Sequence, residues 1–359
     1  MKRRTFGARY VSTETPISGG GGEVFICNDP NLDRQVAIKF LLDGVDKARL
    51  LDEITALQRI RSKNVVQILD LVEDPEKGLG IVAEFLPGDD LETAVVDTTD
   101  RLELLRIVYQ LANGLSDIHS AGIVHRDLKP NNVKYGDENI LKIFDFNLAR
   151  DEEKARTVGF RGTYGFAAPE QHGRGAVHLT SKADVYALGA TIAAVVLGDL
   201  PPALRSVPPR PSEWSGGFSA LGMFDNALAS LLDATLSMNP DHRPTASTIC
   251  RMAGSLLRRD GHRATITVRG VDTIYQLDAR NRVAQIAHSR TGGGVVEVQY
   301  DGLGFVVTTV SGTVLVNRLA CTVGQQLPDS CVIDLGSPSG RLSERLFVTF
   351  DLSHPEVVQ

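Results

Sequence analysis

The hydrophobic and polar positions of this chain of 359 residues change their period near residue 260. Before that point, apolar residues recur at helical spacing over residues 47–61, and an apolar stretch runs from Asp184 to Gly198. That stretch covers roughly fourteen residues, too few to span a bilayer, so we interpret it as a buried helix.

After residue 260 the helical period stops, and short β-rich runs begin. Turn signals such as Asp301-Gly302 and Ser311-Gly312 separate them. The runs cover residues 264–268, 295–300, 305–310, 313–316, 330–334 and 345–350. This spacing predicts a small all-β sandwich over residues 263–355, and about ninety-five residues are enough to bury a core of their own.

Near the N-terminus, Val36-Ala37-Ile38-Lys39 is a β-branched run that predicts a strand ending in lysine. Glu53 falls on the apolar face of the predicted 47–61 helix, between Leu50 and Leu57. A carboxylate on a buried face is costly unless a cation pairs with it. We therefore expect Glu53 to have a basic partner.

The densest chemistry lies at residues 125–132, which read His-Arg-Asp-Leu-Lys-Pro-Asn-Asn, with Asp145-Phe146-Asn147 following. Asp127 can accept a proton from a hydroxyl group, and Lys129 can neutralise a phosphoryl oxygen. Asn132 and Asp145 offer the hard oxygen ligands that suit Mg²⁺. The full run followed by Asp-Phe is a specific signal, whereas His-Arg-Asp alone is a weak one.

These motifs resemble the catalytic loop of eukaryotic-like (Hanks-type) serine/threonine protein kinases. The resemblance extends over residues 8–258, with a small lobe at about 8–86 and a large lobe at about 87–258. It implies a bilobal α+β protein kinase fold, followed here by the small all-β sandwich domain. It also implies ATP and Mg²⁺ as cofactors and proteins as substrates.

The resemblance assigns a role to each charged residue. Lys39, paired with Glu53, would contact the α- and β-phosphates of ATP, and Asp127 would orient or deprotonate the substrate hydroxyl. Lys129 would stabilise the γ-phosphoryl group in transit, while Asn132 and Asp145 would hold the metal. Catalysis would rest on positioning and electrostatics, without a covalent intermediate.

The nucleotide loop departs from the family pattern. The first glycine of the family's hairpin is replaced by Ile17, and its aromatic tip by Gly21. Consecutive glycines lose more entropy when ATP orders them, so we expect weaker nucleotide affinity than a standard loop gives. The residues matched to the nucleotide pocket are Ile17, Ser18, Gly19, Gly20, Gly21, Gly22, Val24, Ala37, Lys39, Glu84, Leu86 and Asp90.

Two further departures concern the same region. Asn147 replaces the glycine that follows Asp-Phe, and asparagine is the non-glycine residue that best tolerates left-handed dihedrals. Lys134 occupies the position where the family places an apolar side chain beneath the adenine.

Residues 145–170 match the activation segment, with Thr163 at the position that contacts Asp127 and Lys129. The resemblance implies that Arg126 binds a phosphate on this segment, and Thr157 is the best candidate for phosphorylation. The alternative that Thr157 is an ordinary surface threonine stays open. Two structural roles are also implied: Asp184 would brace the catalytic loop, and Arg243 would pair with Glu170 of Ala168-Pro169-Glu170.

The C-terminal part resembles a forkhead-associated domain in degenerate form. Ser311-Gly312-Thr313 parallels the Asn-Gly-Thr of that family, and residues 327–336 match its closing strands. Such domains bind phosphothreonine, which needs an arginine, a hydroxyl and backbone donors that converge. The candidate phosphopeptide residues are Arg280, Ser289, Arg290, Ser311 and Thr313. Two signature residues are changed, so a scaffold without phosphothreonine binding is the alternative.

Composition narrows the remaining choices. The net charge of −6 provides no field for nucleic acid or an anionic membrane. The four cysteines show neither metal spacing nor a disulfide framework, and no apolar secretory segment begins the chain, so we expect a cytoplasmic protein. No lysine follows Lys182, a bias towards arginine that suggests a GC-rich bacterial source.

The sequence therefore predicts a serine/threonine protein kinase that phosphorylates its own activation loop and carries a phosphothreonine-binding or docking tail. One alternative is a pseudokinase scaffold whose tail binds phosphorylated partners. Another is a kinase for small molecules, which the peptide-platform motifs at Gly162-Thr163 and Ala168-Pro169-Glu170 make weaker.

Overall fold

The computed structural model describes residues 3–19, 22–40, 54–55, 57–146, 150–151, 156–158, 162–172, 176–269, 274–289 and 293–353. The chain divides into two compact units, Met1–Ala253 and Gly254–Val358.

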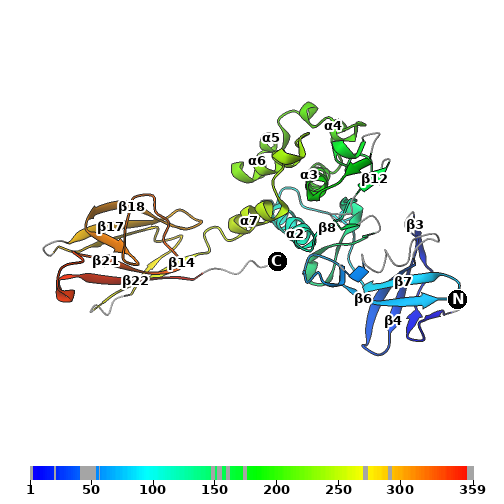
Figure 1. Ribbon diagram of the computed structural model, residues 1–359, viewed down its shortest axis with the longest axis horizontal. Coiled ribbons are helices and arrows are strands. Elements are labelled where there is room, and N and C mark those ends of the chain that lie inside the picture. The colour runs from blue at the N-terminus through cyan, green and yellow to red at the C-terminus, as the bar shows by residue number, and fades with distance from the viewer. Residues whose placement is uncertain are drawn as a thin grey trace. The chain divides into compact units, whose positions relative to one another are not determined.

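The first unit begins with an antiparallel sheet, the small lobe (Figure 1). Its strands are β1 (Thr5–Phe6), β2 (Tyr10–Ser12), β3 (Ile17–Gly19), β4 (Gly22–Asp29), β5 (Arg34–Phe40), β6 (Ile68–Asp74) and β7 (Gly78–Glu84). They lie in the order β1-β2-β4-β5-β7-β6, and β3 pairs with β4. The rings of Phe6, Phe25 and Phe40 pack together with centroids 4.9–5.7 Å apart and hold one face of this sheet.

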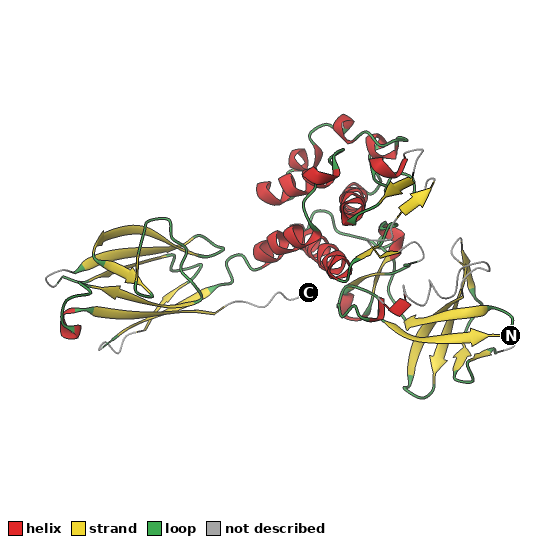
Figure 2. Ribbon diagram, viewed as in Figure 1, coloured by secondary structure: helices red, strands yellow, loops and turns green. Residues whose placement is uncertain are grey.

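The rest of the first unit, the large lobe, is mainly helical (Figure 2). Its helices are α2 (Arg101–Ser120), α3 (Ser181–Leu197), α4 (Pro202–Arg205), α5 (Gly217–Leu221), α6 (Asn226–Thr235) and α7 (Ala246–Leu257), the last of which runs into the second unit. Asp100 caps α2 by accepting hydrogen bonds from the backbone of Leu102 and Glu103.

Helix α3 confirms the buried helix expected between Asp184 and Gly198. It is buried on nearly every side, begins at the capping residue Thr180 and ends at Gly198 with a φ of 72°. A left-handed residue at this point favours glycine, which explains where the helix stops. No helix in the described part of the chain is long and apolar enough to cross a membrane.

Short strand pairs in the large lobe carry the candidate site. The pairs are β8 (Ile123–Val124) with β11 (Arg150–Asp151), β9 (Val133–Tyr135) with β10 (Leu141–Ile143), and β12 (Arg156–Val158) with β13 (Ala176–His178). The loop between β8 and β9 contains residues 125–132, so both of its ends are anchored in strands.

The second unit consists of two antiparallel sheets. One has the order β15-β14-β22-β21-β19-β20, and the other has the order β16-β17-β18. The strands are β14 (Arg263–Val268), β15 (Ile274–Leu277), β16 (Val283–Ala287), β17 (Gly294–Tyr300), β18 (Phe305–Gly312), β19 (Val314–Val316), β20 (Leu319–Ala320), β21 (Ser330–Leu335) and β22 (Leu346–Ser353). Buried side chains from both sheets, among them Ile266, Val298, Phe305 and Phe350, form one hydrophobic core. The β-rich runs expected from the sequence are therefore strands, and β15, β16 and β20 are additional strands at sheet edges.

Candidate active site

A fully buried carboxylate fixes the catalytic loop. Asp184, on α3, accepts hydrogen bonds of 2.7 Å from the backbone nitrogens of both His125 and Arg126, and one of 3.0 Å from Nε2 of His119. Burial alone would raise the pKa of Asp184, but these hydrogen bonds and the attraction of the two histidines outweigh it, and the pKa lies below its usual value. Arg126 has a φ of 73°, a strained conformation that Asp184 holds in place.

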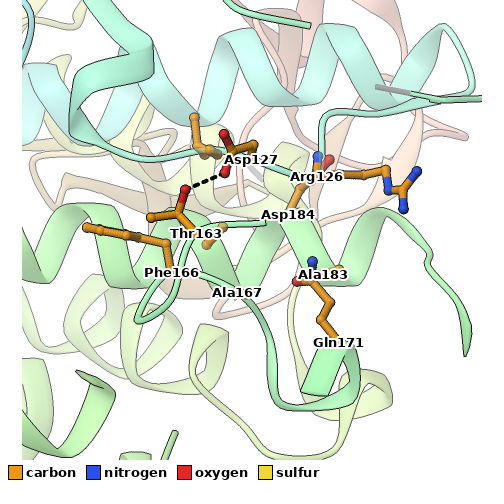
Figure 3. A pocket seen from close by; sticks show the side chains of 10 residues that line it. Arg126, Asp127, Thr163, Phe166, Ala167, Gln171, Ala183 and Asp184 are labelled. Carbon is orange, nitrogen blue, oxygen red and sulfur yellow. Dashed lines mark hydrogen bonds between the residues drawn. The ribbon is translucent and has the colours of Figure 1, made fainter. Parts of the chain in front are cut away.

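Asp127 lies at the centre of a compact polar network. Its Oδ1 accepts a 2.7 Å hydrogen bond from the Thr163 hydroxyl, and Figure 3 shows the two side chains facing each other. The Lys129 ammonium donates to Thr163 Oγ1 at 2.6 Å and lies 3.0 Å from Asp127 Oδ2. These contacts connect the loop to a residue more than thirty positions away and agree with the role expected for Thr163.

Asn132 completes this network. Its amide nitrogen donates to the backbone oxygen of Asp127 at 2.8 Å and to Oδ2 of the same residue at 3.2 Å. The amide oxygen is therefore the atom that Asn132 can offer to a cation. Together with the carboxylate of Asp145, it supplies hard oxygen donors that fit Mg²⁺.

Lys39 and Asp145 are brought together from distant parts of the chain. Lys39 Nζ lies 2.7 Å from Asp145 Oδ1, although the two residues are 106 positions apart. Asp145 has a φ of 66°. His125 supports the segment around it, because its Nε2 donates to the backbone oxygen of Phe144 at 3.1 Å. The phosphate end of the expected nucleotide site thus carries a cation from β5 and a carboxylate that follows β10.

The glycine-rich loop begins as an antiparallel hairpin. Ile17 pairs with Val24, and Gly19 pairs with Gly22. Gly22 has a φ of +118°, and a Cβ there would lie 2.4 Å from the backbone oxygen of Phe40. Only glycine fits this position, because both the dihedral and the close approach exclude a side chain.

At the other end of the expected pocket, Ala37 pairs with Ala83 and Leu86 is buried. Lys142 Nζ contacts both carboxylate oxygens of Glu84, at 2.8 and 2.9 Å. The Asp90 carboxylate accepts hydrogen bonds within its own turn, from the backbone of residues 92 and 93. No sequence pattern indicates a role for Lys142, which is 58 positions from Glu84.

Several predicted site residues lie outside the described residues: Glu53, Gly20, Gly21, Asn147 and Arg290. The side chains of Ser18 and Thr157 are likewise not described. The backbone of Thr157 lies in β12, opposite Val177 in β13.

A buried ion pair supports the segment that carries Thr163. Both terminal nitrogens of the Arg243 guanidinium, Nη1 and Nη2, donate to Glu170, at 2.7 and 2.8 Å, in a bidentate arrangement. The Arg243 side chain has no exposed surface and also donates to the backbone oxygens of Ser237 and Lys182. The pairing expected between Arg243 and Glu170 is confirmed.

A small pocket adjoins Asp127 (Figure 3). The catalytic loop, the segment 162–171 and helix α3 all contribute to its walls. The lining residues are Arg126, Asp127, Leu128, Thr163, Phe166, Ala167, Gln171, Ala183, Asp184 and Ala187.

In the second unit, the structure does not bring all of the candidate phosphopeptide residues together. Val283, at the start of β16, pairs with Gln299, whereas Ala287, at its end, pairs with Val295. Arg280 precedes β16 and Ser289 follows it, so about 16 Å of strand separates them. Ser311 pairs with Val295 and therefore lies at the same end as Ser289, followed closely by Thr313.

Comparison with known proteins agrees with the geometry of the first unit. The family model described as "Protein kinase domain" matches residues 17–253. The chain belongs to the protein kinase family, as the sequence predicted. The forkhead-associated resemblance of the second unit stays a prediction.

Among curated relatives, the chain is 31% identical to the serine/threonine-protein kinase pkn3 of Myxococcus xanthus, over 68% of this chain and 49% of that protein. It is 32% identical to the DNA damage-responsive serine/threonine-protein kinase RqkA of Deinococcus radiodurans, over 54% of this chain and 30% of that protein. The chain thus spans about half the length of the first relative and about a third of the second.

A solved structure of the CAK complex of Chaetomium thermophilum bound to ATP-gamma-S resembles this chain with a TM-score of 0.55 and 21% identity. The likeness covers 68% of this chain and 90% of that one, and it shows the kinase fold, with its mixed helices and strands.

Proposed function

We propose that this protein is a serine/threonine protein kinase that transfers the γ-phosphate of ATP to hydroxyl groups of proteins. The network that joins Asp127, Lys129 and Thr163 supports this proposal most strongly. It places a carboxylate and a cation within 3.0 Å of each other, at the point where a hydroxyl would be activated and a phosphoryl group neutralised.

The proposed mechanism assigns each group a single task. Lys39 binds the α- and β-phosphates, and the ion pair that it now makes with Asp145 is exchanged for contacts with the nucleotide. Asp127 orients the substrate hydroxyl and accepts its proton as the oxygen attacks the γ-phosphorus of ATP. The bond from this phosphorus to the β,γ-bridging oxygen breaks, ADP leaves, and Lys129 balances charge on the transferred group. Mg²⁺ held by Asn132 and Asp145 would neutralise the phosphate oxygens.

Radiolabel transfer from ATP to protein tests this proposal. We expect transfer by the intact protein and a transfer rate lower by about 10² to 10⁴-fold in Asp127→Asn. A protein that binds phosphorylated partners but never transfers phosphate would instead be the pseudokinase scaffold. Transfer of phosphate only to small molecules would identify the protein as a small-molecule kinase.

We further propose that the protein phosphorylates Thr157. Its strand, β12, follows Asp145 in the activation segment, and Arg126 precedes Asp127 in the catalytic loop, where both line the same pocket. Mass spectrometry after incubation with ATP and Mg²⁺ should detect phosphothreonine at 157, which is absent in the Asp127→Asn protein. An unmodified and fully active enzyme would rule this step out.

For the second unit we propose phosphothreonine binding by a forkhead-associated-like loop cluster. Ser289, Ser311 and Thr313 lie at one end of the β16-β17-β18 sheet, and Arg290 follows Ser289 in the sequence. These residues offer hydroxyl groups, and together with an arginine that is adjacent to Ser289 in the sequence they have the chemistry that suits a phosphate dianion. Arg280 has no part in this revised proposal, because it precedes the other end of β16.

A further inference from the structure

An ion pair joins the two lobes of the first unit beside the proposed nucleotide site. Lys142 belongs to β10 of the large lobe, and Glu84 is the last residue of β7 in the small lobe. The ammonium contacts both carboxylate oxygens, at 2.8 and 2.9 Å, and the two side chains are only 17% and 27% exposed. A pair this shielded interacts more strongly than an exposed one.

Glu84 is held in the backbone as well. Its carboxylate accepts a 2.7 Å hydrogen bond from the backbone nitrogen of Gln67, and its own nitrogen donates to the Gln67 oxygen at 3.0 Å. The chain crosses from the small lobe to the large lobe immediately after Glu84. The position and direction of that crossing therefore depend on these contacts.

Glu84 also balances the positive charge of two neighbouring lysines. Lys142 pairs directly with Lys134 across the β9–β10 ribbon, so both side chains leave the same face. Like charges directly opposite each other on a ribbon are destabilising. The Glu84 carboxylate neutralises the charge of Lys142 and so reduces the repulsion between the two lysines near the lobe crossing.

Strand β10 also leads to the phosphate end of the proposed nucleotide site. Asp145, which pairs with Lys39, comes three residues after Lys142. The same short segment therefore contacts the lobe crossing through Lys142 and the phosphate-binding lysine through Asp145.

We propose that Lys142 is a positioning residue for the base end of the nucleotide. Through Glu84 it fixes the backbone at residues 84–86, against which the base of ATP binds in the proposed function on which this inference rests. Lys142 does not touch the nucleotide. It sets the geometry of the segment that does.

The test compares nucleotide binding and turnover in the full chain carrying Lys142→Met. We expect the dissociation constants of both ATP and adenosine, measured by calorimetry, to rise about 3- to 10-fold, with KM for ATP rising in parallel. The value of kcat should change less than twofold. Adenosine has no phosphates, so a weaker affinity for it cannot come from the loss of a charge that attracts the triphosphate.

Four further variants sharpen the test. Lys142→Arg should restore most of the affinity, because it keeps the charge. Glu84→Gln should weaken binding by a similar factor, and the double variant should be no weaker than either single one. Arg210→Gln, which breaks the exposed pair between Arg210 and Glu213 within the large lobe, should leave both affinities unchanged.

Unchanged affinity for adenosine and ATP in Lys142→Met would overturn the inference, even if the melting temperature fell, because the ion pair would then serve stability alone. Phosphate transfer by the wild-type protein would in that case still support the proposed function. A wild-type protein that binds no ATP would overturn both.

Discussion

The candidate sites of the two units differ in how tightly the fold determines them. In the first unit, residues from β5, the catalytic loop, the segment 162–171 and α3 converge through contacts of 2.6–3.0 Å. In the second unit, the described candidate residues lie on loops or, for Ser311, near the end of β18, and the β16-β17-β18 sheet divides them between its two ends. A site built from partly buried charges is fixed by the partners those charges need, whereas a site on exposed loops has no such constraint.

The largest expected effect tests the tightly determined site. Asp127→Asn keeps the shape of the side chain but removes the proton acceptor, so kcat should fall by about 10² to 10⁴-fold. ATP binding measured by calorimetry should change little, because the contacts of Asp127 run to Thr163, Lys129 and Asn132 rather than to Lys39. Asp137→Asn, at an exposed turn of the large lobe, is the matched control. Retained activity in Asp127→Asn would contradict the proposed mechanism.

The next effect concerns the stability of the buried ion pair that supports this site, and not the catalytic residues themselves. Glu170→Gln leaves the fully buried guanidinium of Arg243 without its anion, so the free energy of unfolding should fall by about 3 kcal/mol. Urea denaturation followed by circular dichroism measures it. Glu213→Gln breaks an exposed ion pair in the same lobe and should cost less than about 1 kcal/mol. Equal losses in the two variants would show that burial does not set the difference.

The sequence predicts site residues best where several charged or polar residues lie next to one another in the chain. The run 125–132 keeps its residues adjacent in the chain, and the order of motifs then located Lys39 and Asp145, which the structure brings to 2.7 Å. The pair of Glu84 and Lys142 had no such signal, because neither residue belongs to a local pattern and 58 positions separate them. Pairings of that kind become visible only in three dimensions.

The division of the candidate residues in the second unit has a related cause. The β-rich runs omitted β15, β16 and the two-residue strand β20, which lie at the edges of their sheets. Only Leu277 of β15 and Ile286 of β16 are buried, and edge strands with so few buried positions lack the alternation that predicts a strand. From the sequence, Arg280 is therefore grouped with Ser289 in one candidate site, whereas strand β16 between them places them at opposite ends of a sheet.

A smaller effect in the site of the first unit shows how much activity depends on the positions of Lys129 and Asp127 when their charges are unchanged. Thr163→Ala removes the hydroxyl that connects Lys129 to Asp127, so both side chains lose a partner while every charge remains. We expect kcat to fall about 10- to 100-fold, the range that a small misplacement produces. Thr163→Ser should recover most of the activity. If serine failed to rescue, the methyl group of Thr163, rather than its hydroxyl, would be the important part.

The smallest effects concern the proposed phosphothreonine site of the second unit. They show at which end of the β16-β17-β18 sheet the phosphothreonine binds. The assay is binding of a phosphothreonine peptide to the full chain carrying Asp127→Asn, so that the peptide is not altered during the measurement, with the unphosphorylated peptide as control. Ser311→Ala removes a hydroxyl beside the proposed phosphate position and should weaken binding about 10-fold, as expected for a lost hydrogen bond to a charged group. Arg280→Ala should change the affinity less than twofold, because about 16 Å of strand separates it from Ser289. Loss of binding in Arg280→Ala with none in Ser311→Ala would move the site to the other end of the sheet, where the exposed side chain of Arg280 lies beside β16.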